Sequence, residues 1–353
     1  MRAAGFRRPG TSSTIAPRIS PHAPSGARNH YNSAGGTVMP HVETALGPVD
    51  VNDLGMCLMH EHIVVANWSM RQNYTNYYDA EQQIPKAIAA LKRAADRGVR
   101  SIVDLTPVNL GRDIHTIRRV AEATGVHVIA PTGFYWTEEP QMHGWDAKSL
   151  ANYMVRDIRD GILDTGIKAG VIKCATDNPG VDAFNKKLLQ AAAIAHRETG
   201  VPISTHTTVS NTSARDQQIA FAEFGVDLTR VVIGHCGDST DLDYLQTILD
   251  QGSFIGMDRF GLEAYLPTDK RVQTVAQLCA KGFAGQMVIS HDSCSFQDFF
   301  DQKYIEQFAP NWCYEHVPRD VLPALKAAGV SDRDINTMMV ENPKKVFSKI
   351  GGY

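Results

Sequence analysis

The sequence lacks a strong charge excess, a long apolar run and closely spaced cysteine pairs. The formal net charge is −3 over 353 residues, which argues against nucleic acid or a membrane as a partner. No apolar run reaches the roughly 18 residues that a membrane-spanning helix needs. The six cysteines form no C-x-x-C pair, so we expect free, mostly buried thiols in a reducing compartment and a cytoplasmic protein.

Residues 1–38 differ from the rest because they contain five arginines but no lysine and no acidic residue. Arg7-Arg8 is compatible with twin-arginine export, but no apolar run of roughly 7–15 residues follows it. An organellar targeting segment is compositionally possible, although three prolines interrupt any amphipathic helix. We expect a disordered basic tail, or an upstream extension of a chain whose translation starts at Met39. Residues 39–353 are expected to form one domain.

From residue 79 onward the sequence repeats one pattern, in which a helical stretch ends at a glycine and a short β-branched run follows. Glycine after a helix is a common stop signal, and short apolar runs between helices are typical of buried parallel strands. With the strand that ends at His62, eight βα units are expected. Eight units predict an α/β fold of the (β/α)8 TIM-barrel type. An open, doubly wound sheet is the alternative, but the Gly-rich turn expected after its first strand is missing.

Polar residues stand at the expected carboxyl ends of these strands. His60 and His62 are two residues apart, and alternation along a strand points both to one side while Glu61 points away. In a barrel the strand ends meet at one mouth. The polar residues at these strand ends are His60, His62, Lys173, His206, His235 and Asp292. This set of donors is too rich in nitrogen for calcium or magnesium and suits zinc, cobalt, manganese or iron.

Lys173 is the unusual member, because an ammonium group beside a divalent cation would be repelled. Carboxylation by carbon dioxide would convert it to an anionic carbamate whose two oxygens can bridge two metal ions. Two divalent ions carry +4, and Asp292, the carbamate and a hydroxide together carry −3. The remaining positive charge would polarise a substrate. The alternatives for Lys173 are a general base or a surface lysine.

Several motifs together resemble the phosphotriesterase family of the amidohydrolase superfamily. They are Met59–His62, Gly170–Lys173, Thr205–Thr207, Ile233–His235 and Ser290–Asp292, and the likeness extends from Val42 to Phe347. The sequence looks most similar to the phosphotriesterase-like lactonases, because Gly256–Gly261 places Arg259 where phosphotriesterases proper lack an arginine. Such a resemblance implies a binuclear, metal-dependent hydrolase.

The resemblance also implies a role for each ligand. His60, His62 and Asp292 would hold the more buried metal ion, and His206 and His235 the more exposed one. Carboxylated Lys173 and a hydroxide would bridge the two ions. The hydroxide would attack the substrate while the second ion polarises its carbonyl or phosphoryl oxygen, and Asp292 would take up the released proton.

Four further residues are candidates at the barrel mouth. Tyr135 is expected either to hydrogen-bond a lactone oxygen or the hydroxide, or to be only an aromatic residue at the rim. Arg259 either contacts the substrate or orders its loop through a carboxylate, which we favour. The resemblance implies that the loop after the eighth strand borders the acyl or leaving-group pocket, so its three phenylalanines, Phe296 and Phe299 among them, would line a channel for an acyl chain. Alternatively, their loop packs on the barrel or on the partner of a homodimer.

The expected activity is hydrolysis of small-molecule lactones, including N-acyl-homoserine and other γ/δ-lactones, with promiscuous action on organophosphate triesters. The alternatives are a dedicated phosphotriesterase (aryldialkylphosphatase) and a carboxylesterase or amidase that uses the same site. A non-catalytic barrel is disfavoured by the complete ligand set. A metal-free Schiff-base lyase that uses Lys173 would predict trapping by borohydride and no effect of a chelator.

Overall fold

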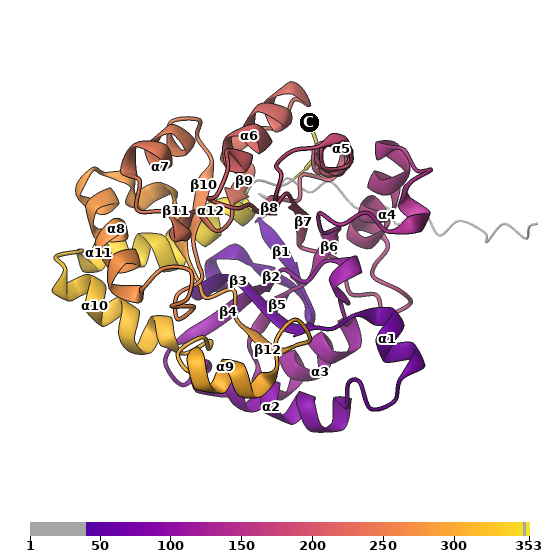
Figure 1. Ribbon diagram of the computed structural model, residues 1–353, viewed down its shortest axis with the longest axis horizontal. Helices are drawn as coiled ribbons and strands as arrows, with labels where there is room; N and C mark the ends of the chain where they lie inside the picture. Colours follow the sequence, from indigo (N-terminus) through magenta and orange to yellow (C-terminus); the bar gives the residue numbers. More distant parts are fainter. Residues whose placement is uncertain (1–39, 349–350) are drawn as a thin grey trace, which may run out of the picture. The chain divides into compact units, whose positions relative to one another are not determined.

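Strands and helices alternate along the chain in its computed structural model, which describes residues 40–348 and 351–353 (Figure 1). The strands lie at the centre and the helices surround them. The expectations for residues 1–38 lie outside the described residues. In the described ranges, no helix combines the length and the apolar character that crossing a bilayer requires.

The central strands form the predicted parallel barrel. Strands β3–β4–β5 pair in one sheet and β6–β7–β8–β9–β10–β11 in another, and every pairing is parallel. The nitrogen of Asp292 donates to the oxygen of His60 at 2.9 Å, which joins the end of β11 to β3. The eight strand positions are β3 Met56–Val65, β4 Val99–Asp104, the two short consecutive strands β5 His127–Ile129 and β6 Pro131–Gly133, which together fill one position, β7 Val171–Ala175, β8 Ile203–His206, β9 Val231–Ile233, β10 Phe254–Met257 and β11 Met287–Ile289.

The helices begin and end largely where local sequence signals place them. Asp113 caps α3, where its Oδ1 accepts from the nitrogen of Thr116 at 3.0 Å, and Gly125 ends the helix in the left-handed region at φ 68°. A side-chain acceptor and a left-handed glycine satisfy backbone groups that the helix itself leaves unpaired. The outer helices are α2 Ala80–Ala95, α3 Ile114–Thr124, α4 Ala147–Arg159, α5 Ala183–Thr199, α6 Ser213–Glu223, α7 Leu242–Leu249 and α8 Thr268–Ala280. Shorter helices are α1 Trp68–Asn73, α9 Gln302–Phe308, α10 Leu322–Ala327, α11 Asp332–Asn336 and α12 Asn342–Ser348.

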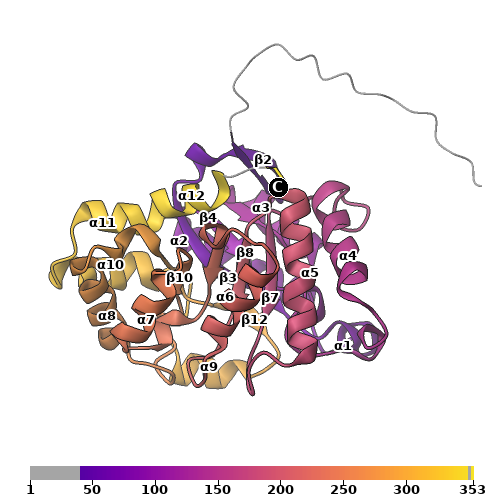
Figure 2. The ribbon, with the colours of Figure 1, turned by 90° about the horizontal axis from the view of Figure 1, so that it is seen from above.

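Two apolar clusters hold the barrel together. The larger one lies between strands and helices and includes Leu58, Ile102 and Leu188. In the smaller one, apolar side chains of the barrel strands meet Val42 of the hairpin β1 His41–Thr44/β2 Gly47–Asp50 and Phe347 of α12. Figure 2 shows the hairpin and α12 at the end of the barrel opposite α9. One end of the barrel is therefore covered, and the carboxyl ends of the strands lie at the other.

Some strand ends differ from those expected. β3 does not end near His62 but runs on to Val65, because this extension pairs in parallel with β12 Cys294–Gln297. Conversely, β9 and β11 end two or three residues early, so His235 and Asp292 lie in the turns that follow. Both residues have positive φ, 60° and 56°. The ligand set is thus carried partly by strands and partly by left-handed turns.

We predict that Asn342→Ala lowers the free energy of unfolding by about 2 kcal/mol. The Asn342 side chain is fully buried and its Nδ2 donates to the oxygens of Ala284 and Met287, both at 2.7 Å. Alanine would leave both carbonyls without this donor. Urea unfolding of the variant beside Asn336→Ala, an exposed control, measures the difference. Equal stability of the two variants would contradict this role.

Candidate metal centre

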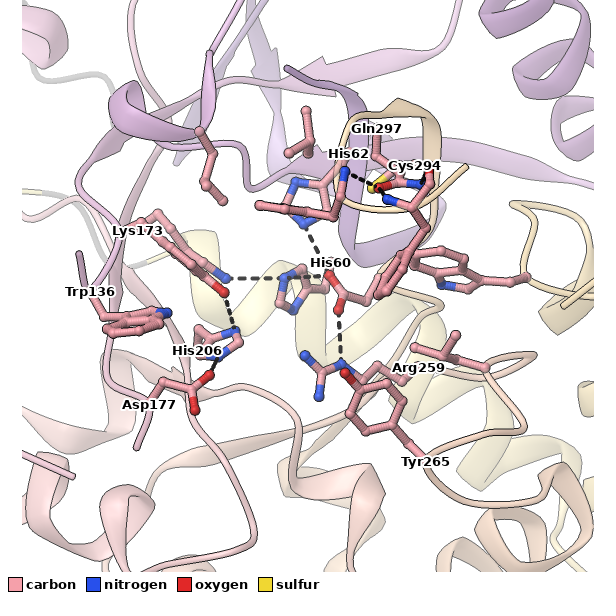
Figure 3. Close-up of a pocket in the computed structure, with 18 residues that line it drawn as sticks. His60, His62, Trp136, Lys173, Asp177, His206, Arg259, Tyr265, Cys294 and Gln297 are labelled. Carbon is pink, nitrogen blue, oxygen red and sulfur yellow. Dashed lines mark hydrogen bonds and ion pairs between the residues drawn. The ribbon is translucent and has the colours of Figure 1, made fainter. Parts of the chain in front are cut away.

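His60, His62 and Asp292 form a compact group at the carboxyl end of the barrel. Oδ1 of Asp292 lies 3.0 Å from Nε2 of His62 and 3.3 Å from Nε2 of His60. The three donor atoms all lie within 4.8 Å of one another. Figure 3 shows the two histidines pointing into the same cavity as Lys173 and His206. The alternation argument placed this pair correctly on one side of β3.

Lys173 lies between this group and the remaining histidines. Its side chain is 1% exposed, and Nζ lies 3.1 Å from Nε2 of His60. Burial lowers the pKa of Lys173 to about 8, although Asp292 and Asp258 act in the opposite direction. About a tenth of the amine is therefore neutral at pH 7, far more than for an ordinary lysine, and a neutral amine is the form that reacts with carbon dioxide.

His206 and His235 form the second nitrogen pair. Nε2 of His235 faces Nδ1 of His206 at 2.8 Å, and both rings are buried. The other nitrogen of His206, Nε2, lies 2.9 Å from Oδ2 of Asp177. With the proton on Nε2 and donated to Asp177, the Nδ1 lone pair points toward His235 and the cavity. Sequence reasoning did not identify Asp177.

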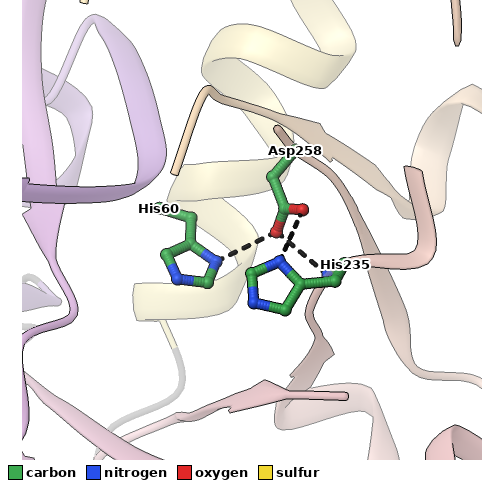
Figure 4. A group of neighbouring side chains, drawn as sticks. All are labelled: His60, His235 and Asp258. Carbon is green, nitrogen blue, oxygen red and sulfur yellow. Dashed lines mark hydrogen bonds and ion pairs between the residues drawn. The ribbon is translucent and has the colours of Figure 1, made fainter. Parts of the chain in front are cut away.

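Asp258 contacts two of the histidines at Nδ1, the ring nitrogen opposite the expected metal-binding Nε2 (Figure 4). Its Oδ2 lies 2.9 Å from Nδ1 of His60 and its Oδ1 lies 2.9 Å from Nδ1 of His235. These three residues also meet the distance criterion for a metal group. However, each imidazole uses Nδ1 toward the carboxylate, which leaves Nε2 toward the cavity. We therefore assign Asp258 as the acceptor that fixes both tautomers.

The protonation states are consistent with metal binding. Burial, reinforced by Lys173, lowers the pKa of His60 to about 4, and burial also lowers the pKa values of His206 and His235. Burial tends to raise the pKa of Asp292, but the neighbouring His60 and His235 hold it well below its usual value. Neutral imidazoles and an ionised carboxylate are the forms that coordinate metals.

Glu61 points away from the cavity, as alternation predicted, and fixes the turn that carries Asp292. Its two oxygens accept from the nitrogens of His291 and Ser293 at 3.0 and 2.9 Å, on either side of Asp292. Nδ1 of His291 also lies 2.6 Å from Oε1 of Glu61. His291 is thus engaged with Glu61 and does not belong to the ligand group.

Arg259 is held by two carboxylates. Its Nε donates to Oδ2 of Asp292 at 2.9 Å and its Nη1 donates to Oδ2 of Asp238 at 2.7 Å. The guanidinium lies over the Tyr265 ring, 4.8 Å from its centroid. This arrangement supports the interpretation that Arg259 orders its surroundings through carboxylate partners. Arg259 thus binds one oxygen of Asp292, Oδ2, and leaves Oδ1 facing His60 and His62.

The candidate centre lies at the base of a cavity of about 470 Å³. Tyr135 lines it, with its hydroxyl 3.4 Å from Nδ1 of His206. Phe299 also lines it. Phe296 does not, because its ring packs edge-on against Tyr78 at 5.0 Å, outside the cavity. Phe300, the third phenylalanine of this loop, lines the cavity as well. Other apolar lining residues are Val65, Leu110, Trp136, Leu262, Tyr265 and Trp312.

The donor set fits two divalent transition-metal ions. It offers four imidazole nitrogens, one carboxylate and one buried amine. All line the shared cavity except His235, which lies behind His206 at 2.8 Å. Imidazole and carboxylate donors suit zinc and its neighbours in the periodic table.

A parallel barrel with histidine and aspartate groups that can hold metal at its carboxyl end is the architecture of a metal-dependent hydrolase. A sequence model of the phosphotriesterase family matches residues 40–347. The chain belongs to this family and is a hydrolase.

Known proteins resemble the chain over most of its length. A phosphotriesterase homology protein of Mycobacterium tuberculosis is 46% identical over 327 residues, which cover 89% of this chain and 100% of that protein. The solved structure of the phosphotriesterase from Mycobacterium tuberculosis superposes with a TM-score of 0.86, at 46% identity, and covers 89% of this chain and 100% of its own. An aryldialkylphosphatase of Saccharolobus solfataricus is 39% identical over 304 residues, 85% of this chain and 97% of that protein.

We predict that Asp258→Asn lowers metal affinity by about 10- to 100-fold. Asparagine keeps one acceptor oxygen, so one of the two imidazoles faces an NH₂ group and loses the tautomer that presents Nε2. The measurement is metal content per chain by mass spectrometry after dialysis against a graded chelator. Asp250→Asn, at an exposed position, controls for the lost charge. Metal retention equal to that of the control would refute the role of Asp258.

Proposed function

We propose that the protein hydrolyses lactones, N-acyl-homoserine and other γ/δ-lactones included, and acts promiscuously on organophosphate triesters. The observation that carries this proposal is that the cavity has a polar base and largely apolar walls. Its base holds His60, His62, His206, Lys173 and Asp292, while its walls and mouth are largely aromatic and aliphatic. A lactone with an acyl tail has the matching division, with one polar carbonyl group at the end of an apolar chain.

Two divalent ions would bind at the base, one at His60, His62 and Asp292 and the other at His206 and His235. When bound, they would activate water and polarise the substrate oxygen. Zinc is our first choice, and cobalt, manganese and iron suit the same donors.

We assign Lys173 as the anionic bridge in its N6-carboxylated form. The neutral Nζ adds to the carbon of carbon dioxide, and the nitrogen loses one proton to water, which leaves a carbamate with a single negative charge. The low pKa of the buried Lys173 favours this addition. The anion also removes the repulsion that an ammonium group would exert on cations at the neighbouring histidines.

Asp292 and Tyr135 act on the substrate from the protein side. Asp292 is ionised, and its Oδ1 faces the cavity while Arg259 holds its Oδ2, so Oδ1 can receive the proton that the reaction releases. The Tyr135 hydroxyl, beside His206, is placed to donate to a lactone oxygen. The apolar walls exclude water around the rest of the substrate.

Dedicated phosphotriesterase activity is the second candidate, favoured by the similarity to the Saccharolobus aryldialkylphosphatase. A carboxylesterase or amidase would use the same groups. The test is a side-by-side comparison of kcat/KM for acyl-homoserine lactones, simple lactones, a carboxylester, an amide and paraoxon on zinc- and cobalt-loaded protein. We expect lactones to be the best substrates. A paraoxon value above every lactone value would make the phosphotriesterase assignment the correct one.

We predict that Lys173→Ala loses metal and at least about a thousandfold of activity. Short carboxylic acids should restore part of both, because a carboxylate can occupy the space of the missing carbamate. The measurements are metal content and lactone hydrolysis with and without added acetate or propionate. Lys270→Ala, an exposed lysine, is the control. A Lys173→Ala variant with full metal content and rate would disprove the bridge.

We predict that Phe299→Ala and Phe300→Ala raise KM for long-chain lactones by about 3- to 10-fold and change KM for short-chain lactones less. Each ring would otherwise cover part of the tail, at about 25 cal/mol per Å² of apolar area removed from water. Phe308→Ala removes an equally exposed aromatic ring that does not line the cavity. Equal changes for both chain lengths would argue against a tail site here.

A further inference from the structure

The loop between β12 and α9 is folded around the side chain of Gln297. Its Oε1 accepts from the nitrogens of Phe299 and Phe300 at 2.7 and 2.9 Å, and its Nε2 donates to the oxygen of Phe300 at 3.0 Å. Gln297 is 4% exposed and lines the cavity beside Cys294 (Figure 3). One buried amide thus binds both backbone nitrogens of the two phenylalanines at the cavity mouth.

The next residue, Asp298, fixes the same loop to β3 and the segment that follows it. Oδ2 of Asp298 accepts from the nitrogen of Asn67 and from the hydroxyl of Tyr77, both at 2.6 Å. The nitrogen of Asp298 donates to the oxygen of Val65 at 3.1 Å. The loop is therefore attached to the segment after β3 just before Phe299 begins.

Apart from the Phe300 ring, which stacks with the Tyr304 ring at 6.4 Å between centroids, the two phenylalanine rings have little packing of their own. Phe299 is 61% exposed and Phe300 is 49% exposed, yet both line the cavity. Exposed apolar rings on a short loop gain little free energy from their own burial. Their positions are therefore set by the backbone, and the backbone is set by Gln297 and Asp298.

We propose that Gln297 is a positioning residue that determines specificity for substrates with an apolar tail, because it holds Phe299 and Phe300 where such a tail leaves the cavity. The inference rests on the proposed lactonase function for the identity of the substrate head group. It differs from the role of the two phenylalanines, since Gln297 acts through their backbone and its polar side chain makes no apolar wall.

The first test compares Gln297→Met, which keeps the side-chain length but makes none of the three hydrogen bonds, with Gln297→Glu, which keeps the acceptor. For Gln297→Met, we expect the ratio of KM for a long-chain lactone to KM for a short-chain lactone to rise about tenfold. Gln297→Glu should stay within about threefold of wild type. Gln302→Met makes the same exchange at an exposed position of α9 and should match wild type. A Gln297→Met ratio within twofold of wild type overturns the proposal.

Two further measurements do not depend on lactone turnover. Native-state hydrogen exchange should show faster exchange of the Phe299 and Phe300 amides in Gln297→Met than in Gln302→Met. In calorimetric binding of a long-chain and a short-chain fatty acid, the ratio of the long-chain Kd to the short-chain Kd should rise by the same factor of about ten. If wild type cleaves no lactone but both results hold, the proposed function fails and the positioning role stands. Unchanged exchange, or faster exchange with an unchanged binding ratio, overturns the positioning role.

Discussion

The structure depends on the closure of the barrel between its first and last strands. The hydrogen bond from the nitrogen of Asp292 to the oxygen of His60 joins two segments from opposite ends of the domain. Because of this closure, Asp292 lies beside both histidines of β3, and the other strand ends face the same cavity. Glu61 strengthens the same junction, since it binds the backbone on either side of Asp292.

Closure alone would bury several charges, and burying an unpaired charge costs several kcal/mol. The structure resolves this with carboxylates that each bind two partners. Asp258 accepts from His60 and His235, and Asp238 pairs with Arg259 and Arg271. These contacts also fix the direction of each donor atom, so the groups that stabilise the barrel mouth are the same groups that prepare it for metal.

Much of this architecture follows from local signals in the sequence. Glycine stops and β-branched runs predicted the eight strands, and polar residues after those runs predicted six side chains that converge. The role of Asp258 was not visible, because its partners come from strands distant in sequence and are chosen only when the barrel closes. The extension of β3 depends on pairing with β12, which no local pattern reports.

The cavity mouth was the least predictable part. The family resemblance suggested that the phenylalanines of this loop, Phe296 and Phe299 among them, would line it together. Phe299 and Phe300 line it instead, with both backbone nitrogens bound to the Gln297 side chain, while Phe296 packs on Tyr78. Residue type alone does not predict hydrogen bonds between a side chain and the backbone that follows it. Substrate specificity is therefore harder to infer from sequence than the chemistry of the metal-binding groups at the bottom of the cavity.

The central claim is that six side chains from five strands and turns hold two metal ions with a carboxylated lysine between them. Anomalous X-ray diffraction from crystals of zinc-loaded protein tests it most directly. We predict two anomalous peaks, one beside His60, His62 and Asp292 and one beside His206 and His235, with extra density on Nζ of Lys173. Fewer than two peaks at these residues, or an unmodified Lys173 between two bound ions, would contradict the account.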